Sequence, residues 1–228
     1  MDKPLSLNLL LRYLFVYIFV LSFVYAESFD QSKKILKNIY TDHQTTFYCG
    51  CSYTYENQGN MIERKSCGYV PRNATTKKGN LNERVRRIEW EHVMPAENFG
   101  KHLPCSREGG RKACQKDPVF QKMEADMMNL VPAIGELNGD RSNYRYGANE
   151  PKIGQYGQCN FEVDFEANRA YVRPEIRGDI ARIYFYMSEK YNINLSKQER
   201  QMMEAWDKLD PIDEWEKERI QRIKKYQF

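Results

Sequence analysis

The spacing of apolar side chains predicts helices at both ends of the chain. In residues 29–41, Ile35, Leu36 and Ile39 fall on one helical face. Ser196 and Glu199 form a capping-box pattern that predicts the start of another helix. The buried stripe of that helix is predicted to be Met202, Met203, Trp206 and Leu209. Between these two helices, residues 179–192 carry a stripe of Ile180, Ile183, Tyr184, Met187 and Tyr191.

Strands are predicted in the middle of the chain. In residues 85–93, Ile88 and Trp90 alternate with charged residues, and residues 161–165 alternate in the same way. Short strands or loops tied by cysteines are expected over 47–55 and 68–70. A short helix is expected over 132–142, with Pro132 in its first turn. Helices dominate late in the chain, so the pattern predicts an α+β fold in a single mixed, helix-rich domain.

The first 26 residues are typical of a secretory signal peptide. Lys3 and Arg12 precede a largely apolar run, and Ala26 ends a small-residue cleavage signal. An uncleaved membrane anchor is the alternative, but such a span needs about 20 apolar residues, and Arg12 cuts the run short. The mature domain is therefore expected over residues 27–228, in a protein exported to the periplasm or the medium.

Charge and cysteine content refine this expectation. Removing residues 1–26 lowers the net charge from +4 to +3, which permits a polyanionic partner without requiring one. Basic residues cluster at Arg84, Arg86 and Arg87, at Arg107, Arg111 and Lys112, and at Arg141 and Arg145. Such clusters are usually solvated faces and are weak evidence alone.

Six cysteines in an exported chain predict three disulfides, although fifteen connectivities are possible. The absence of any Cys-x-x-Cys pair from the sequence argues against a zinc site. Spacing favours Cys105–Cys114, because the intervening Gly109-Gly110 allows a sharp turn. Cys51–Cys67 is a plausible local pair, which leaves Cys49 with Cys159.

His92 is the histidine with the most suggestive neighbours. Strand parity places it on the face of Ile88 and Trp90, where a lone histidine is most often a core residue. Glu91 would then point the other way. For both side chains to serve one site, the strand must end or bulge near Trp90.

Three sequence motifs favour a functional role for His92 over a role in the core. They are Trp-Glu-His-Val-Met-Pro (90–95), Gly-Gly-Arg-Lys-Ala-Cys (109–114) and Asn-Leu-Val-Pro-Ala-Ile-Gly-Glu-Leu-Asn-Gly-Asp-Arg (129–141). In this order, the chain from about 47 to 215 resembles the endonuclease I family of periplasmic and secreted bacterial nucleases with a ββα-metal active site. Met128 departs from that pattern, because relatives usually carry histidine there, and Lys217 stands where many carry cysteine.

The resemblance implies a role for four residues. Glu91 and Asn138 match the ligands of one divalent metal, His92 matches the general base, and Arg111 matches the arginine at the scissile phosphate. The chemistry agrees independently, because Mg²⁺ prefers oxygen ligands, a neutral histidine accepts a proton, and a guanidinium binds phosphate. Taken alone, Asn138 would more simply cap a helix and Arg111 would be an ordinary loop charge.

Further residues are assigned supporting roles. Glu124 is expected to orient His92, and Asn129 to fix the loop before Pro132. Arg141 and Arg145 are expected either to contact the DNA backbone or only to line a helix surface.

The sequence thus predicts a monomeric, Mg²⁺-dependent endonuclease, with Ca²⁺ or Mn²⁺ as substitute ions. Its expected substrates are double- and single-stranded DNA and, as a further candidate, RNA, cut with little sequence preference to 5′-phosphate products. The alternatives are a catalytically silent exported nucleic-acid-binding protein and a phosphodiesterase for a small substrate. The intact set of predicted ligands and base argues against the silent protein, because binding alone requires only basic residues.

Overall fold

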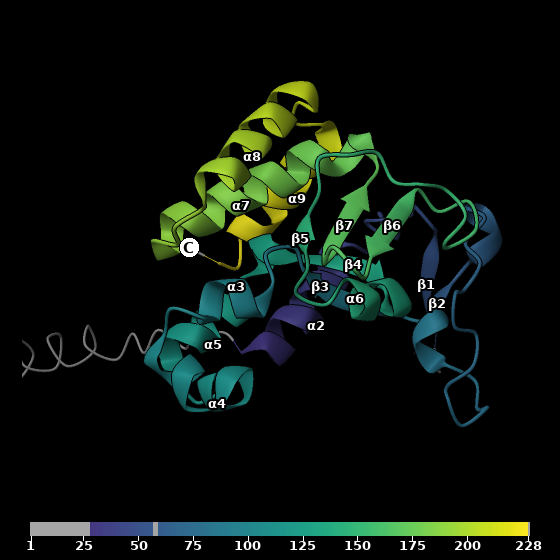
Figure 1. Cartoon of the computed structure of the whole chain (residues 1–228), viewed down its shortest axis with the longest axis horizontal. Helices are drawn as coiled ribbons and strands as arrows, with labels where there is room; N and C mark the ends of the chain where they lie inside the picture. The colour runs from purple at the N-terminus through teal and green to yellow at the C-terminus, as the bar shows by residue number, and fades with distance from the viewer. Residues whose placement is uncertain (1–27, 57–58, 228) are drawn as a thin grey trace, which may run out of the picture.

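The computed structural model describes residues 28–56 and 59–227 (Figure 1). The predicted signal peptide and its cleavage site lie outside these ranges. Within them, the structure contains no helix that combines the length and apolar character needed to cross a bilayer. The described chain mixes helices with short strands, which confirms the predicted α+β class.

Three helices near the C-terminus pack together at one side of the molecule (Figure 1). They are α7 (Arg177–Tyr191), α8 (Lys197–Leu209) and α9 (Glu214–Lys224). Ser196 caps α8 by accepting a hydrogen bond from the Glu199 amide at 3.2 Å, which satisfies one of the free N–H groups at the helix start. The predicted stripe of α8 is partly wrong, because Leu209 lies in the last turn and is 79% exposed, whereas Met203 and Trp206 are buried.

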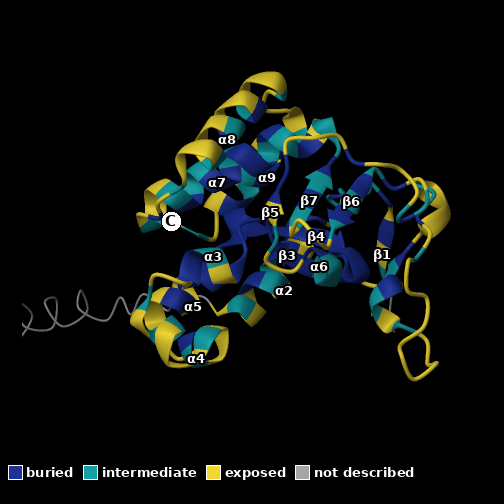
Figure 2. Ribbon diagram, viewed as in Figure 1, coloured by how far each residue is buried: buried dark blue, intermediate teal, exposed yellow. Residues whose placement is uncertain are grey.

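The remaining helices cover the other side. α2 (Phe29–Ile39) begins at a Ser28 cap and buries Leu36 and Ile39, as its apolar spacing predicts. α3 (Ala96–Gly100) is largely buried. α4 (Pro104–Cys114) and α5 (Pro118–Glu124), which follow it in the sequence, form a more exposed lobe (Figure 2).

Within residues 28–56 and 59–227, the strands form three small sheets. β1 (Tyr53–Glu56) pairs with β2 (Gly59–Ile62), and β5 (Arg145–Tyr146), β7 (Arg169–Val172) and β6 (Phe161–Asp164) form the second sheet in that order. β3 (Ile88–His92) and β4 (Leu130–Ile134) form the third, an antiparallel pair at the centre of the molecule. The described part of the chain also contains 3-10 turns at η1 (Arg64–Ser66), η2 (Glu83–Val85), η3 (Met127–Asn129) and η4 (Pro174–Ile176).

The predicted helix over 132–142 starts later than expected. Pro132 lies in β4 opposite Trp90, and α6 (Gly135–Arg141) follows directly. A proline is tolerated here because β3 and β4 form a two-stranded sheet, in which each strand has an edge that needs no ladder partner. The Pro132 carbonyl still accepts a hydrogen bond, from the Phe47 amide at 2.8 Å.

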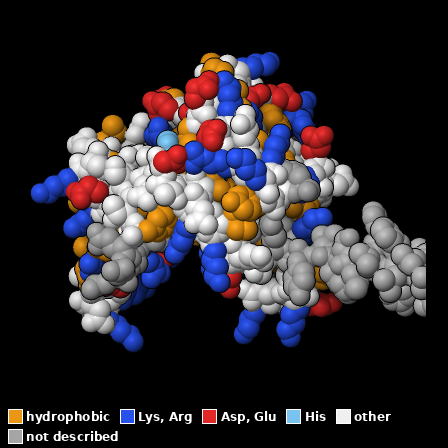
Figure 3. All heavy atoms as spheres, turned by 180° about the vertical axis from the view of Figure 1, so that it is seen from behind, with side chains coloured by type: hydrophobic (Ala, Val, Ile, Leu, Met, Phe, Trp, Pro, Cys, Tyr) orange, Lys and Arg blue, Asp and Glu red, His pale blue; other side chains and the backbone are white. Residues whose placement is uncertain are grey.

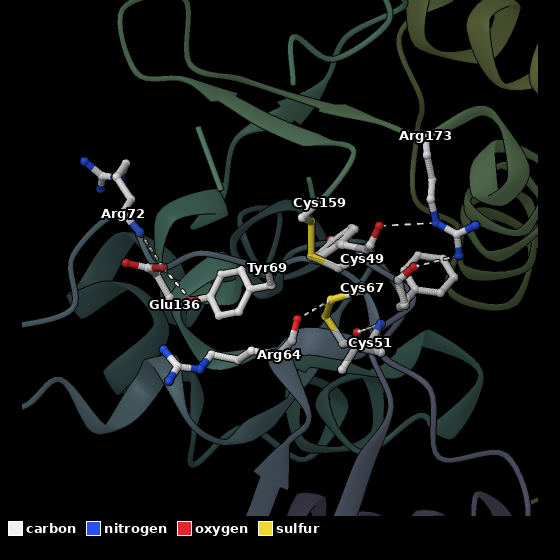
Figure 4. The surroundings of a disulfide bond; sticks show 12 residues. Cys49, Cys51, Arg64, Cys67, Tyr69, Arg72, Glu136, Cys159 and Arg173 are labelled. Carbon is white, nitrogen blue, oxygen red and sulfur yellow. Dashed lines mark hydrogen bonds between the residues drawn. A yellow bond between two sulfur atoms is a disulfide. The ribbon is translucent and has the colours of Figure 1, made fainter. Parts of the chain in front are cut away.

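The cysteines form the three pairs that spacing favoured. Cys105 bonds Cys114. Cys51 bonds Cys67, and Cys49 bonds Cys159 (Figure 4). The structure therefore contains no free cysteine within the described ranges. Three disulfides fit an exported protein, since such bonds persist in oxidising compartments.

Candidate active site

The frame of the site consists of β3, β4 and α6. β3 pairs with β4 from Ile88 opposite Ile134 to His92 opposite Leu130, with no extra residue in the register. The bulge considered near Trp90 is therefore absent from this pair, and β3 ends at His92 itself. Glu91 and His92 consequently point to opposite faces, as strand parity requires.

The imidazole of His92 is held in one orientation. Its Nε2 lies 2.8 Å from the main-chain oxygen of Glu124, and the ring packs against Phe29 and Phe99. A carbonyl oxygen only accepts, so Nε2 carries the proton and Nδ1 keeps its lone pair. Burial lowers the pKa of His92 to about 4, which outweighs the hydrogen bond to Glu124 and keeps the ring neutral near pH 7.

The carbonyl that holds His92 belongs to a firmly anchored segment. The next carbonyl, that of Ala125, accepts a 2.6 Å hydrogen bond from the buried Ser32 hydroxyl of α2. The buried carboxylate of Asp126 accepts hydrogen bonds from Tyr186, Lys190, Tyr191 and Gln227. Helix α2, helix α7 and the end of the chain thus fix the position of the His92 ring.

Arg111 forms an ion pair with Glu124, the residue whose carbonyl holds His92. The Arg111 Nε and Nη2 atoms lie 3.2 and 2.7 Å from the Glu124 Oε1 atom, and the Arg111 side chain is 52% exposed. Glu124 was predicted to orient His92, and it does contact that ring, but through its main-chain oxygen; its carboxylate orients Arg111. Nη1 of Arg111 takes no part in this ion pair with Glu124.

Helix α4 breaks just before Arg111. Gly109 and Gly110 have non-helical dihedral angles, and Gly110 has a φ of +60°, which favours glycine. The Cys105–Cys114 disulfide closes this kinked segment.

Removing that disulfide is therefore expected to weaken both stability and phosphate binding. For Cys105→Ser with Cys114→Ser, a loop this short predicts a loss of about 2–3 kcal/mol of unfolding free energy. Because Arg111 loses its covalent restraint, kcat/KM on DNA should fall as well. Denaturant melts and steady-state kinetics would measure both effects, and unchanged kinetics with lower stability would show that Arg111 does not need the bond.

Glu91 lies in a buried polar cluster. Its Oε1 atom accepts hydrogen bonds from the Tyr48 hydroxyl at 2.8 Å and from Arg141 Nη1 at 3.0 Å. Burial raises the pKa of Glu91 to about 7, against the opposing effects of Arg141 and Tyr48. Within the described chain, both hydrogen bonds to Glu91 end on Oε1, so Oε2 is the oxygen that remains for a cation.

The predicted contact of Arg141 with DNA is wrong. Its guanidinium is fully buried and also donates to the main-chain oxygens of His92 at 2.9 Å and Val93 at 2.7 Å. Arg141 therefore braces the end of β3 and cannot reach a nucleic acid. Arg145, four residues later, is exposed, and its contact with DNA stays a prediction.

Asn138 lies on the face of α6 that packs against β3. Its Nδ2 donates to Glu89 Oε2 at 3.0 Å, so its Oδ1 is the atom free to bind a cation. Asn138 is one turn before Arg141, which contacts Glu91, so Asn138 and Arg141 lie on the same face of α6. Asn129 has the expected structural role, because its amide bonds both main-chain polar atoms of Met94.

A cleft of about 800 Å³ opens over these elements. It brings together His92, Arg111 and Asn138. Glu91 is buried and is not a lining residue, so the structure does not place its carboxylate in the cleft with His92. Sequence reasoning missed several of its lining residues: Phe29, Asp30, Lys33, Lys34, Lys37 and Glu89. Arg84 and Arg87 also line it, and both pair with the Glu89 carboxylate. Seen from behind, Lys and Arg side chains gather along the hollowed underside of the molecule (Figure 3).

The donor set fits a hard cation. No group of three or more His, Cys, Asp and Glu side chains able to hold a metal occurs within 28–56 and 59–227. Glu91 and Asn138 instead offer one carboxylate and one amide oxygen. Mg²⁺ prefers oxygen ligands and keeps several waters, so a site with two protein ligands suits it.

Comparison with known proteins identifies the family. The sequence profile described as Endonuclease I matches residues 28–228. The chain belongs to the endonuclease I family. It is 48% identical to a periplasmic deoxyribonuclease of Aeromonas hydrophila over 205 residues, covering 89% of this chain and 83% of the relative.

Two other members of the endonuclease I family are similarly close. An extracellular deoxyribonuclease of Aeromonas hydrophila is 46% identical over 88% of this chain and 85% of the relative. Endonuclease-1 of Buchnera aphidicola subsp. Acyrthosiphon pisum (strain APS) is 45% identical over 86% of this chain and 76% of the relative. The family that the three motifs suggested is therefore confirmed, and periplasmic or extracellular relatives agree with an exported chain.

Proposed function

We propose that this protein is a metal-dependent endonuclease that hydrolyses phosphodiester bonds in double- and single-stranded DNA with little sequence preference. The observation that carries the proposal is the neutral His92, whose Nε2 is fixed on the Glu124 carbonyl, in a cleft shared with Arg111. The names of the family relatives, which are deoxyribonucleases and endonucleases, support the choice of substrate.

The chain's own residues divide the reaction between them. His92 Nδ1 accepts a proton from the attacking water, and the bond between Nε2 and the Glu124 carbonyl stabilises the resulting imidazolium. Arg111 binds a phosphate oxygen through the part of its guanidinium not engaged by Glu124. The lysines of α2 hold the backbone in the cleft without reading bases, so little sequence preference is expected.

Glu91 and Asn138 would hold the divalent ion through Oε2 and Oδ1. When bound, Mg²⁺ would supply the positive charge that stabilises the leaving 3′ oxygen, so the products would carry 5′-phosphates. Arg141 and Tyr48 keep the Glu91 carboxylate oriented by occupying its other oxygen.

The test is digestion of a plasmid by the purified mature protein, with and without EDTA. EDTA is expected to abolish cleavage, and Mg²⁺ should restore it, because the proposed ligands are oxygen atoms that bind a hard cation. Full activity in EDTA would contradict the metal mechanism. A dinucleotide and an RNA transcript, assayed in parallel, separate this function from a small-substrate phosphodiesterase and define the range of polymers.

Glu89 provides the control for the ligand assignment. Glu91→Gln should weaken Mg²⁺ binding directly, whereas Glu89→Gln should weaken it less, since the Glu89 carboxylate is paired with Arg84 and Arg87 and only orients Asn138. Isothermal titration of each variant with Mg²⁺ would measure this, and the reverse result would move the metal to Glu89.

A further inference from the structure

Residues 71–82 form a long exposed segment between η1 and η2, which we name the clamped loop. It projects from the end of the molecule opposite α4 (Figure 1). Residues 72–81 are all exposed, so the loop contributes little to the core. A loop of this length within a compact domain usually has a function.

The clamped loop is ordered within itself. Thr75 and Leu81 form an antiparallel bridge, and the Asn82 amide bonds the Ala74 carbonyl at 3.0 Å. At the tip, the Thr76 amide bonds the Asn80 carbonyl at 2.8 Å, and Gly79 has a φ of +79°. The loop is thus a small hairpin whose turn is set by glycine.

The base of the loop is fastened to α6 by a buried carboxylate. Glu136 accepts hydrogen bonds from the Tyr69 hydroxyl at 2.6 Å, the Arg72 amide at 3.1 Å and the Asn73 amide at 2.6 Å (Figure 4). The Cys51–Cys67 disulfide fixes the chain two residues before Tyr69. Glu136 itself is two residues before Asn138, so the loop and the proposed ligand share one helix.

A second attachment comes from the same helix. The guanidinium of Arg72 donates two hydrogen bonds to Asp140, at 3.1 and 3.0 Å, and lies over the Phe165 ring. Two acidic residues of α6 therefore hold the clamped loop, although the loop itself buries almost no surface. Such fastening presents the tip in a fixed position.

The charge of the loop is entirely positive. Residues 71–82 contain Arg72, Lys77 and Lys78 and no Asp or Glu. Lys77 and Lys78 lie at the exposed tip. The chain continues directly to Arg84 and Arg87, which line the cleft. Figure 3 shows a hollow on the underside of the molecule, between the clamped loop and the lobe of α4 and α5.

We propose that the clamped loop is a second DNA-binding arm, which places Lys77 and Lys78 against the phosphate backbone of a duplex outside the catalytic cleft. This proposal rests on the proposed nuclease function. The arm is already folded and fastened, so little conformational entropy is lost when it binds. Its contacts are to phosphates and add affinity without sequence preference.

The test compares two lengths of duplex. With Lys77→Ala and Lys78→Ala together, kcat/KM on a duplex of about 30 base pairs should fall about tenfold at low salt, with kcat unchanged. The slope of log binding constant against log salt should become shallower by about 2, since each lost phosphate contact removes about 0.9. On a duplex of about 8 base pairs, roughly 27 Å long, the variant should match the wild type.

The matched control is Lys197→Ala with Lys208→Ala, which removes the same charge from the exposed surface of α8. This control should leave the salt slope unchanged. An unchanged slope for the loop variant, or an equal loss on both duplexes, would overturn the arm. If the wild-type protein cuts neither duplex, the nuclease function itself fails, and the two failures are thereby distinguished.

Discussion

His92→Ala is expected to lower kcat on DNA by about a thousandfold, within the range typical of a general base. The substitution removes Nδ1, the nitrogen whose lone pair the Glu124 carbonyl leaves free. The base acts only in the transition state, so KM for DNA and the affinity for Mg²⁺ should change little. Steady-state cleavage of a labelled duplex, with separate binding titrations, measures these quantities.

His102→Ala serves as the control, because His102 is exposed and lies outside the cleft. It should cleave at the wild-type rate. Wild-type kcat in His92→Ala would instead identify His92 as a core residue, the reading that strand parity alone favoured. Thermal melts of both variants separate a chemical defect from a folding defect.

Arg141→Met is expected to destabilise the protein by about 3–5 kcal/mol, because it leaves one member of a buried ion pair without its partner. Glu91 would lose a bond at 3.0 Å, and the carbonyls of His92 and Val93 would lose their donors. For a domain of this size, the melting temperature should fall by roughly 10 °C. Denaturant titration and thermal melts measure the loss.

Arg145→Met makes the same chemical change four residues away, at the exposed position of β5. Its stability should stay within about 0.5 kcal/mol of the wild type. Equal stability of the two variants would show that the buried Arg141 contributes no more than a surface arginine. Assaying DNA affinity of Arg145→Met at the same time tests its predicted backbone contact.

Much of the fold follows from local pattern. The apolar spacing of α2 and α7 and the cap at Ser196 predict helices within a few residues of their observed ends. The disulfide pairs also followed from spacing, because two of them close short loops and leave one choice for the third. Leu209 was wrongly assigned to the buried stripe of α8. It is the last residue of that helix, and its side chain is exposed there.

The site was harder to predict because its side chains are positioned by contacts with residues that are far away in the sequence. Arginine is rarely buried, so nothing local marks Arg141 as a brace for Glu91 rather than a contact for DNA. The lysines of α2 are visible as a polar helix face, but only packing shows that this face borders His92. The alternation of Glu89 and Glu91 gave parity correctly, yet the arginine partner of each carboxylate depended on where η2 and α6 lie in the fold.

The Cys49–Cys159 bond constrains the order in which the exported chain can mature. It joins residues 110 positions apart, whereas the other two bonds join residues 16 and 9 apart. In a chain that crosses the membrane from its N-terminus, Cys51–Cys67 and Cys105–Cys114 can close during translocation, but Cys49 has no native partner until Cys159 emerges. Cys49 is only two residues from Cys51 and competes with it for Cys67 throughout that interval. An early Cys49–Cys67 bond would have to be exchanged before the mature protein forms, so its yield depends on thiol–disulfide exchange as well as on oxidation.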